Sequence, residues 1–431
     1  MRPSISWAWG KANTLFLLAL LLSGSLQARQ VPVLTLEEAQ EQARQHYPIS
    51  RQRDLLLQTE QFTLENLSKG YLPQVGLNGQ ATYQSAVTQL PISLPGVEII
   101  PLPKEQYKVF AEVSQLVFDG GLIRQQKKAA QLQTAVETQK VEVELLRLQD
   151  RINQLYLGTL LLDAQLKQVD LVQLDLEAGI RRVEAQVKNE VSFKSNLYLL
   201  QAELLKNNQR RAELRSARQA TLQTLGLFVG QALPESVVLP LPVPTEVMAY
   251  QQIQRPELKV YSFQQSLLEQ QQKLLLARNL PKASLFGQTG YGRPGLNFLQ
   301  NQADFWYMGG FRLNWSLGNL YTARNDRKLI GVNQQLTQIQ LENFLLNTNA
   351  QLTQQRAEID KLQQLVVTDQ EIVGLREKVK AAASAQLSNS VITPNDYLRE
   401  VYAEDQARQT LILHQLQLLQ AQINYKTTLG Y

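Results

Sequence analysis

The sequence predicts a mixed α/β membrane protein in which antiparallel strands alternate with very long helices, and in which this arrangement occurs twice. Three observations predict this fold class. Motifs of the first half recur in the second half, long proline-free stretches carry a coiled-coil pattern of apolar residues, and short segments alternate apolar with polar residues. The two halves are therefore expected to be internal repeats of one architecture.

Short matching motifs indicate the internal repeat. "AQVKNEV" at 185–191 returns as "AQLSNSV" at 385–391, and "YLPQVGL" at 71–77 returns as "NLPKASL" at 279–285. The first pair is 200 residues apart and the second pair 208, so the first half carries extra residues before its long helix. We expect them in the proline-rich stretch 90–103, because surface loops tolerate insertions. The predicted domains are a first repeat at 29–232, an extended linker at 233–244 and a second repeat at 245–431.

Each repeat is expected to contain a long helical hairpin. From Leu145 to Val187, apolar residues recur at alternating spacings of three and four, which is a coiled-coil pattern, and only Thr159 and Gln173 interrupt it. No proline occurs within 119–191 or 319–391. Each stretch therefore predicts a helix of about 70 residues, or about 105 Å at 1.5 Å per residue. A second helix follows each, which predicts hairpins at about 119–228 and 319–430.

Shorter elements are expected to precede these hairpins. Helical segments interrupted by Pro48 and Pro256 come first in each repeat, and strand hairpins at about 74–117 and 282–315 follow, because apolar and polar residues alternate there with a period of two. This alternation favours strands with one face toward lipid and one toward water, with a hairpin in a soluble sandwich as the alternative. Trp306 and Trp315 lie near the two ends of the last strand, where membrane-interface aromatics are expected. "GQTGYG" at 287–292 falls within the strand pattern, so it is interpreted as strand backbone.

The number of strands predicts an oligomer. Two hairpins supply four strands, whereas a closed transmembrane barrel needs at least about eight. Open strand edges are not tolerated in lipid. Several protomers must therefore contribute strands to one barrel.

Composition excludes several classes of protein. Residues 1–28 are expected to be an export signal, with positive charges before an apolar run at 15–22 that is too short to span a bilayer. The net charge is +5, and two of these charges belong to the signal, so no nucleic-acid partner is implied. The chain has no cysteine and only two histidines, His46 and His414, and it carries no nucleotide-binding or catalytic motif. We therefore expect no enzyme, no cofactor and no metal site, and we interpret His414 as a packing or tunnel-lining residue.

Read together, these motifs resemble the outer membrane efflux proteins, also called the TolC family. The resemblance covers essentially the whole chain after the signal, and it is carried by "LTLEEAQEQARQHYP" at 34–48, "LPQVGL" at 72–77, "QLVFDGG" at 115–121, "NEVSFKSNLYLLQAEL" at 189–204 and "NSVITPNDYLREVYAED" at 389–405. It implies a homotrimer with a twelve-stranded β-barrel in the outer membrane lipid of a Gram-negative bacterium, continued by an α-helical barrel in the periplasm. It also implies the exit duct of a tripartite efflux pump or type I secretion system, working with a periplasmic adaptor (membrane fusion) protein and an inner membrane transporter. A periplasmic coiled-coil scaffold or adaptor without channel activity is the alternative.

The resemblance also places a gate and an adaptor contact at the two helical turns. The family's acidic turn position aligns with Asn196 in the first turn and Asp396 in the second, so the gate candidates are Asp396, Asn395, Asn196 and Ser195. Three copies of Asp396 would form a negative ring that selects cations, while a helix N-cap after Pro394 is an alternative and compatible role. The adaptor-contact candidates are Glu190, Ser192, Phe193, Lys194, Ser390, Thr393 and Pro394. Glu190 and Ser390 replace the glycine that the family usually has at the turn, which leaves the turn conformation open.

The motif "FDGG" is expected to join the last strand of the first hairpin to the long helix. Asp119 would cap the helix start. Gly120 and Gly121 would permit a sharp change of direction. We assign these three residues a structural role at the strand–helix junction.

Overall fold

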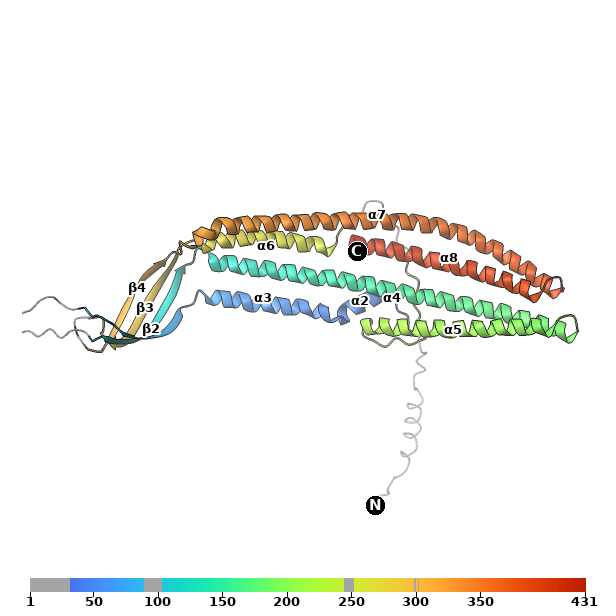
Figure 1. The fold of residues 1–431 in the computed structure, drawn as a ribbon, viewed down its shortest axis with the longest axis horizontal. Coiled ribbons are helices and arrows are strands. Elements are labelled where there is room, and N and C mark those ends of the chain that lie inside the picture. Colours follow the sequence, from blue (N-terminus) through green and yellow to red (C-terminus); the bar gives the residue numbers. More distant parts are fainter. Residues whose placement is uncertain (1–31, 89–102, 244–251, 298–299, 301) are drawn as a thin grey trace, which may run out of the picture.

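The protein is described by a computed structural model that covers residues 32–88, 103–243, 252–297, 300 and 302–431. The export signal expected at 1–28 and nearly all of the proline-rich stretch 90–103 lie outside the described residues. The molecule is elongated, with a sheet at one end and the turns of two helical hairpins at the other (Figure 1).

The two halves contain similar elements in the same order. The first half has α2 (Leu36–His46), the short 3-10 helix η1 (Pro48–Arg51), α3 (Gln52–Lys69), β1 (Gln74–Tyr83), β2 (Glu105–Phe118), α4 (Leu122–Lys188) and α5 (Lys194–Val229). The second half has α6 (Pro256–Arg278), β3 (Lys282–Arg293), β4 (Asp304–Asn314), α7 (Asn319–Ser388) and α8 (Pro394–Leu429). The predicted combination of long helices with an antiparallel sheet is confirmed. Pro256, expected to interrupt a helix, instead begins α6, where its missing N–H group costs nothing.

The predicted coiled-coil seam of α4 is confirmed by burial. Leu145, Ile152, Leu176 and Val183 are all at most 7% exposed, and the polar seam residue Thr159 is fully buried. The Thr159 hydroxyl donates to the Leu155 carbonyl oxygen, 2.8 Å away, so a polar residue is tolerated in the seam.

Among the described residues, no helix is both long and apolar enough to cross a membrane.

The four strands form one antiparallel sheet in the order β1-β2-β3-β4. The register pairs Val75 with Val113, Ala111 with Thr289, and Thr289 with Tyr307, so the side chains of these residues share one face. The large apolar side chains of this face are 44–81% exposed; they are Val75, Leu77, Tyr83, Tyr107, Val109, Val113, Leu285, Tyr291, Phe305, Tyr307, Phe311 and Leu313. We call it the apolar face.

The opposite side of the sheet, the polar face, is held together by polar contacts. Arg312 pairs with Glu112 at 2.7 Å, and the Gln288 amide donates to the same carboxylate at 2.5 Å. The sheet therefore exposes its apolar side chains and gathers its charged ones, the reverse of the usual arrangement in a sheet that packs against a core.

Asp119, Gly120 and Gly121 lie where β2 turns into α4. Both glycines have positive φ, 68° and 79°, and a Cβ on Gly120 would stand 2.7 Å from the Leu280 Cβ. The buried Asp119 carboxylate accepts hydrogen bonds from the backbone N–H groups of Gly121 and Ile123, each at 2.8 Å. The junction thus needs glycine for its backbone and a short carboxylate for the free N–H groups of the helix start.

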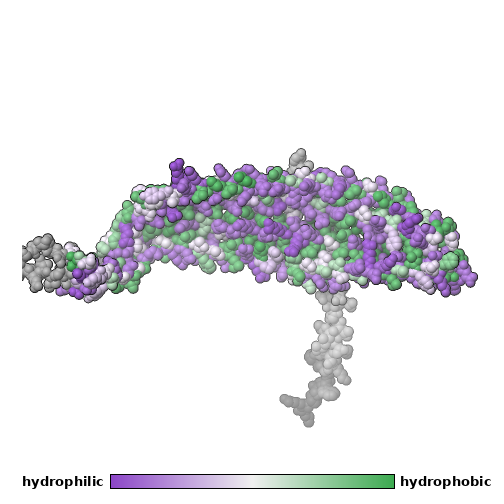
Figure 2. All heavy atoms as spheres, in the orientation of Figure 1, coloured by the Kyte–Doolittle hydropathy of each residue, from purple (hydrophilic) through white to green (hydrophobic). Residues whose placement is uncertain are grey.

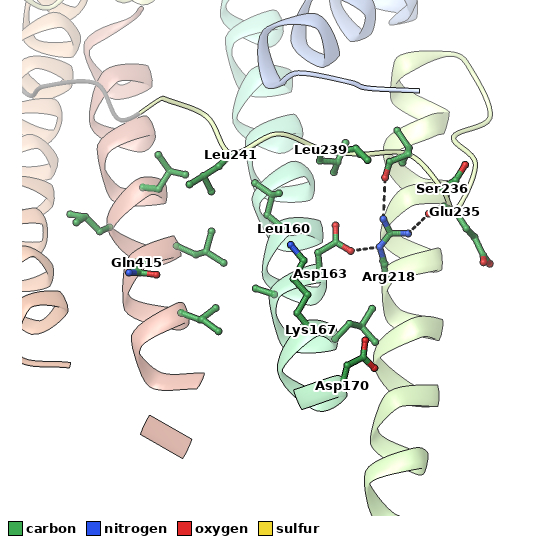
Figure 3. A pocket seen from close by; sticks show the side chains of 18 of the residues that line it. Leu160, Asp163, Lys167, Asp170, Arg218, Glu235, Ser236, Leu239, Leu241 and Gln415 are labelled. Atoms are coloured by element: carbon green, nitrogen blue, oxygen red, sulfur yellow. Dashed lines mark hydrogen bonds and ion pairs between the residues drawn. The ribbon is translucent and has the colours of Figure 1, made fainter. Parts of the chain in front are cut away.

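The segment 233–243 follows α5 in extended form and passes over α4 toward α8 (Figure 3). Arg218 of α5 holds it by donating to the carbonyl oxygens of Glu235 and Val237, at 2.7 and 3.2 Å, and pairs with Asp163 of α4. A cavity of about 860 Å3 lies beneath this segment between α4 and α8.

Candidate functional site: the two helical turns

The two long helices end in the same backbone conformation. Glu190 and Ser390 have φ values of 61° and 60°, in the left-handed region that glycine usually occupies. In each turn the next residue closes the helix end, because Val191 N–H donates to the Gln186 carbonyl oxygen at 2.8 Å and Val391 N–H to that of Gln386 at 2.9 Å. The turns therefore keep the glycine-type geometry although neither has glycine.

The second turn begins α8 with a complete capping box. Thr393 is the N-cap, and its hydroxyl accepts from Asp396 N–H at 3.2 Å, while the Asp396 carboxylate accepts from Thr393 N–H at 3.2 Å. This corrects the expected N-cap role of Asp396, which instead stands at the third helical position and completes the box. The Thr393 hydroxyl, which donates at 2.7 Å, and the Thr393 backbone N–H hold the pKa of Asp396 below its ordinary value.

The first turn has no such box. Phe193 stands at the N-cap of α5 and offers no side-chain acceptor. The Asn196 amide reaches back to the Ser192 hydroxyl at 3.2 Å, and Asn196 N–H donates to the Phe193 carbonyl oxygen at 3.0 Å. The two turns thus share a backbone but differ in how the following helix starts.

The predicted site residues are not equally accessible. Glu190, Phe193, Lys194, Ser390 and Thr393 are exposed, as are the gate candidates Ser195 and Asn395. Ser192, Asn196 and Asp396 are half-buried. Pro394, another adaptor-contact candidate, is buried at the first position of α8. The exposed tip is instead apolar at Val191, Phe193 and Val391, which are 62–79% exposed.

Polar contacts tie the two turns together, and the sequence analysis missed them. The Gln186 amide of α4 donates to the Leu387 carbonyl oxygen at 2.9 Å and to the Ser390 hydroxyl at 3.1 Å. One turn higher, Arg182 donates to the Ser384 hydroxyl at 2.7 Å. Gln186 belongs to the repeated motif "AQVKNEV", so the repeat was the available signal for this contact.

An ion-pair cluster continues this connection away from the tip. Lys380 of α7 lies 2.9 Å from Asp175 of α4 and 3.2 Å from Glu404 of α8, whose side chain is only 2% exposed. Burial opposes the charge of Lys380, but the two carboxylates outweigh burial and raise the pKa of the ammonium group. Lys380 thus stays charged at neutral pH and joins three helices.

An apolar core supports the tip. Tyr397 of α8 is 2% exposed and packs with Leu200 and Leu387, which are fully buried. A Cβ on Gly179 would lie 3.2 Å from the Tyr397 ring, so the small residue lets α4 approach α8 closely. The core holds the two hairpins together beneath the polar contacts.

Three further residues singled out in the sequence lie away from the two turns. Trp306 lies on the polar face of the sheet, with its ring centroid 5.8 Å from that of Phe110. Trp315 is 54% exposed just after β4, and its indole N–H donates to the Asn279 carbonyl oxygen at 3.0 Å. His414 of α8 contacts Asp369 of α7, with 2.6 Å between its Nδ1 and the carboxylate.

Comparison with known proteins shows the fold. No protein-family model and no curated protein matches the sequence. Three similar solved structures are VceC from Vibrio cholerae, CusC, and MtrE from Neisseria gonorrhoeae in its open state. VceC is 15% identical with a TM-score of 0.69, covering 92% of this chain and 96% of its own. CusC is 14% identical with a TM-score of 0.71, covering 92% of each chain. MtrE is 14% identical with a TM-score of 0.67, covering 92% of this chain and 88% of its own. All three are described as outer membrane proteins or transmembrane channels, and this chain has the same fold as these proteins.

Proposed function

We propose that the chain is one subunit of a homotrimeric exit duct in the outer membrane of a Gram-negative bacterium. The observation that carries this proposal is the inverted sheet, whose apolar face is 44–81% exposed at its large apolar side chains. Water is a poor environment for so large an apolar surface, whereas lipid is a good one. The polar face would then line a water-filled conduit.

The sheet also supports the trimer. β1 and β4 are edge strands with one unpaired side each. In lipid, unpaired backbone groups cost several kcal/mol each. Pairing β4 of one copy with β1 of the next would close a twelve-stranded barrel from three copies.

The helices have a matching unpartnered surface. Leu329, Val332, Leu336, Ile339 and Leu346 of α7 follow spacings of three, four and seven, and all are 50–68% exposed. On the other side of the molecule, Leu55 and Phe62 of α3 are each 60% exposed. Hydrophobic residues also reach the surface along the edge of the helical body where α7 lies (Figures 1 and 2). Packing α7 of one copy against α3 and α5 of the next would continue the barrel as a periplasmic tube.

The duct itself would be passive. Energy would come from an inner membrane transporter of a tripartite efflux pump or type I secretion system, and a periplasmic adaptor protein would contact the exposed tip around Glu190, Phe193, Lys194 and Ser390. Three copies of Asp396 would form a negative ring near the closed end, with Asn395, Asn196 and Ser195 beside it. The capping box and this ring are compatible, because the box keeps the carboxylate ionised.

A periplasmic scaffold without channel activity is the alternative. Long helices would serve such a scaffold as well as they serve a duct. A scaffold would not need a sheet with an exposed apolar face. The inverted sheet therefore favours the duct. Among the described residues, no group of three or more His, Asp or Glu side chains is placed to hold a metal ion.

Conductance of the purified full chain in a planar bilayer tests the proposal, with the native mass of the same sample. We expect a trimer with small, stable, cation-selective steps, and reduced cation selectivity in Asp396→Asn. Asn395→Asp is the matched variant, since it adds a carboxylate beside the proposed ring and should strengthen selectivity. A monomer that stays in the soluble fraction would contradict the duct and favour the scaffold.

A further inference from the structure

A second cavity, of about 530 Å3, lies on the polar face of the sheet at the end farthest from the helices. Its strand residues include Gln80, Lys108, Phe110, Gln288, Trp306 and Met308. The register places them on one face, because Gln80 pairs with Lys108 and Gly290 pairs with both Phe110 and Trp306. We call it the outer cavity; its volume is typical of sites that hold small organic molecules.

Two aromatic rings form one wall of the outer cavity. The centroids of Phe110 and Trp306 are 5.8 Å apart, with 42° between the ring planes. They meet over Gly290, where a Cβ would stand only 2.5 Å from the Phe110 Cβ. Gly290 of "GQTGYG" therefore makes room for a pair of rings on the polar face.

The lining also contains cationic and amide side chains. The Lys108 ammonium lies 5.8 Å from the Phe110 ring centroid, and Arg293 also lines the cavity. No Asp or Glu lines it among the described residues. Glutamine side chains surround the rings at Gln80, Gln84, Gln106 and Gln288. The Gln288 amide donates to Glu112 and the Gln84 amide to Gln106, so each of these two has one further N–H to offer.

These features together select a class of ligand. Aromatic faces bind flat rings by stacking, and an ammonium group beside them binds an anion by a charge-assisted hydrogen bond. A cationic ligand would meet Lys108 already placed near the Phe110 ring, while the Glu112 carboxylate beside the cavity is already paired with Arg312 and Gln288. The lining thus suits a ring that carries a negative group.

We propose that the outer cavity binds planar aromatic anions, such as aromatic carboxylates and sulfonates. The ring lies against Phe110 and Trp306, and the anionic group lies at Lys108. The inference rests on the proposed duct, since the polar face must line the conduit for cargo to reach the cavity. It deepens that function by assigning one class of cargo three sites, one per subunit, near the outer opening.

The test uses 2-naphthalenesulfonate as probe and quenching of tryptophan fluorescence in the detergent-purified full chain as readout. We expect saturable quenching that largely disappears in Trp306→Phe. Lys108→Gln should weaken binding about tenfold and Phe110→Leu about fivefold, as the loss of a charged or aromatic partner predicts. Phe286→Leu is the matched control, because Phe286 is an aromatic of the same face outside the cavity lining, and it should bind as the unchanged protein does.

A probe of opposite charge completes the test. (2-Naphthyl)trimethylammonium has the same ring, and we expect it to bind at least about tenfold more weakly. Equal affinity for the two probes, or unchanged affinity in both Lys108→Gln and Phe110→Leu, would overturn the assignment. Binding without conductance would keep the assignment and remove the duct, whereas conductance without binding would keep the duct and remove the assignment.

Discussion

Thr393 and Phe193 occupy equivalent positions in two turns that otherwise share one backbone. Only Thr393 offers an oxygen to the start of its helix, and only Asp396 can return the bond. The second turn is therefore held from both ends, and the first is left with an exposed aromatic ring. This difference makes the two turns internal controls for each other.

Thr393→Ala should loosen the start of α8. Loss of an N-cap hydroxyl costs about 1 kcal/mol, so the N–H groups at 395–397 should exchange about fivefold faster with solvent. Hydrogen exchange measured by mass spectrometry checks this. Phe193→Ala should leave exchange at 195–197 unchanged, because Phe193 makes no side-chain cap; equal acceleration in both turns would contradict the role of the box.

The capping box should also depend on pH. The folded-state pKa of Asp396 lies below its ordinary value of 3.8, so the contribution of the box is fully present above about that pH and is lost as pH falls through the folded-state value. Protection at 395–397, corrected for the pH dependence of intrinsic exchange, should fall over that acidic range. Asp396→Asn should remove this pH dependence.

Residue positions were predictable where local rules decide them. "FDGG" indicated the junction because a positive φ requires glycine and a helix start requires an acceptor. Trp306 and Trp315 were both placed at the membrane interface, yet they are nine residues apart, so in a regular strand they would face opposite sides. The odd spacing between the two tryptophans is visible in the sequence. Which face of β4 is polar became clear only from its pairing with β3 and, through β3, with β2.

Helical elements were predicted well because their pattern is long and regular. The seam from Leu145 to Val187 indicated which face of α4 is buried, and the structure ends this helix at Lys188. Polar contacts between hairpins could not be predicted in this way. The periodic pattern indicates which positions of one helix are buried. The hydrogen-bond and ion-pair partners of Gln186 and Lys380 depend instead on how the two hairpins are placed relative to each other.

Gln186→Leu should make the two turns part more easily. The change removes the amide donor to the Leu387 carbonyl oxygen and the Ser390 hydroxyl, and about 1 kcal/mol predicts a roughly fivefold larger population of separated turns. Distances between spin labels at Lys188 and Asn389 measure this population. Gln386→Leu, the equivalent position of the second half, is the control, since no side-chain hydrogen bond of Gln386 is found in the described part of the chain. An equal broadening of the distance distribution in both variants would contradict the proposed role of the Gln186 hydrogen bonds.

At the scale of the whole molecule, the unpartnered stripe on α7 should control assembly. Leu336→Glu places a charge in the proposed contact between copies, and we expect the trimer fraction in detergent to fall more than about tenfold. Gln338→Glu, on the opposite side of the same helix, should leave the native mass unchanged. A trimer that persists in Leu336→Glu would assign the stripe to another partner.

For the proposed duct, the open edges of the sheet have a consequence for how subunits enter the membrane. A lone copy has four strands and two unpaired edges, so its apolar face favours the bilayer while its edge backbone groups oppose entry. If insertion waits until three copies meet, its rate rises with a high power of protomer concentration. Slow synthesis would then leave monomers with their apolar face exposed. The yield of trimer would depend on the relative rates of trimer formation and aggregation.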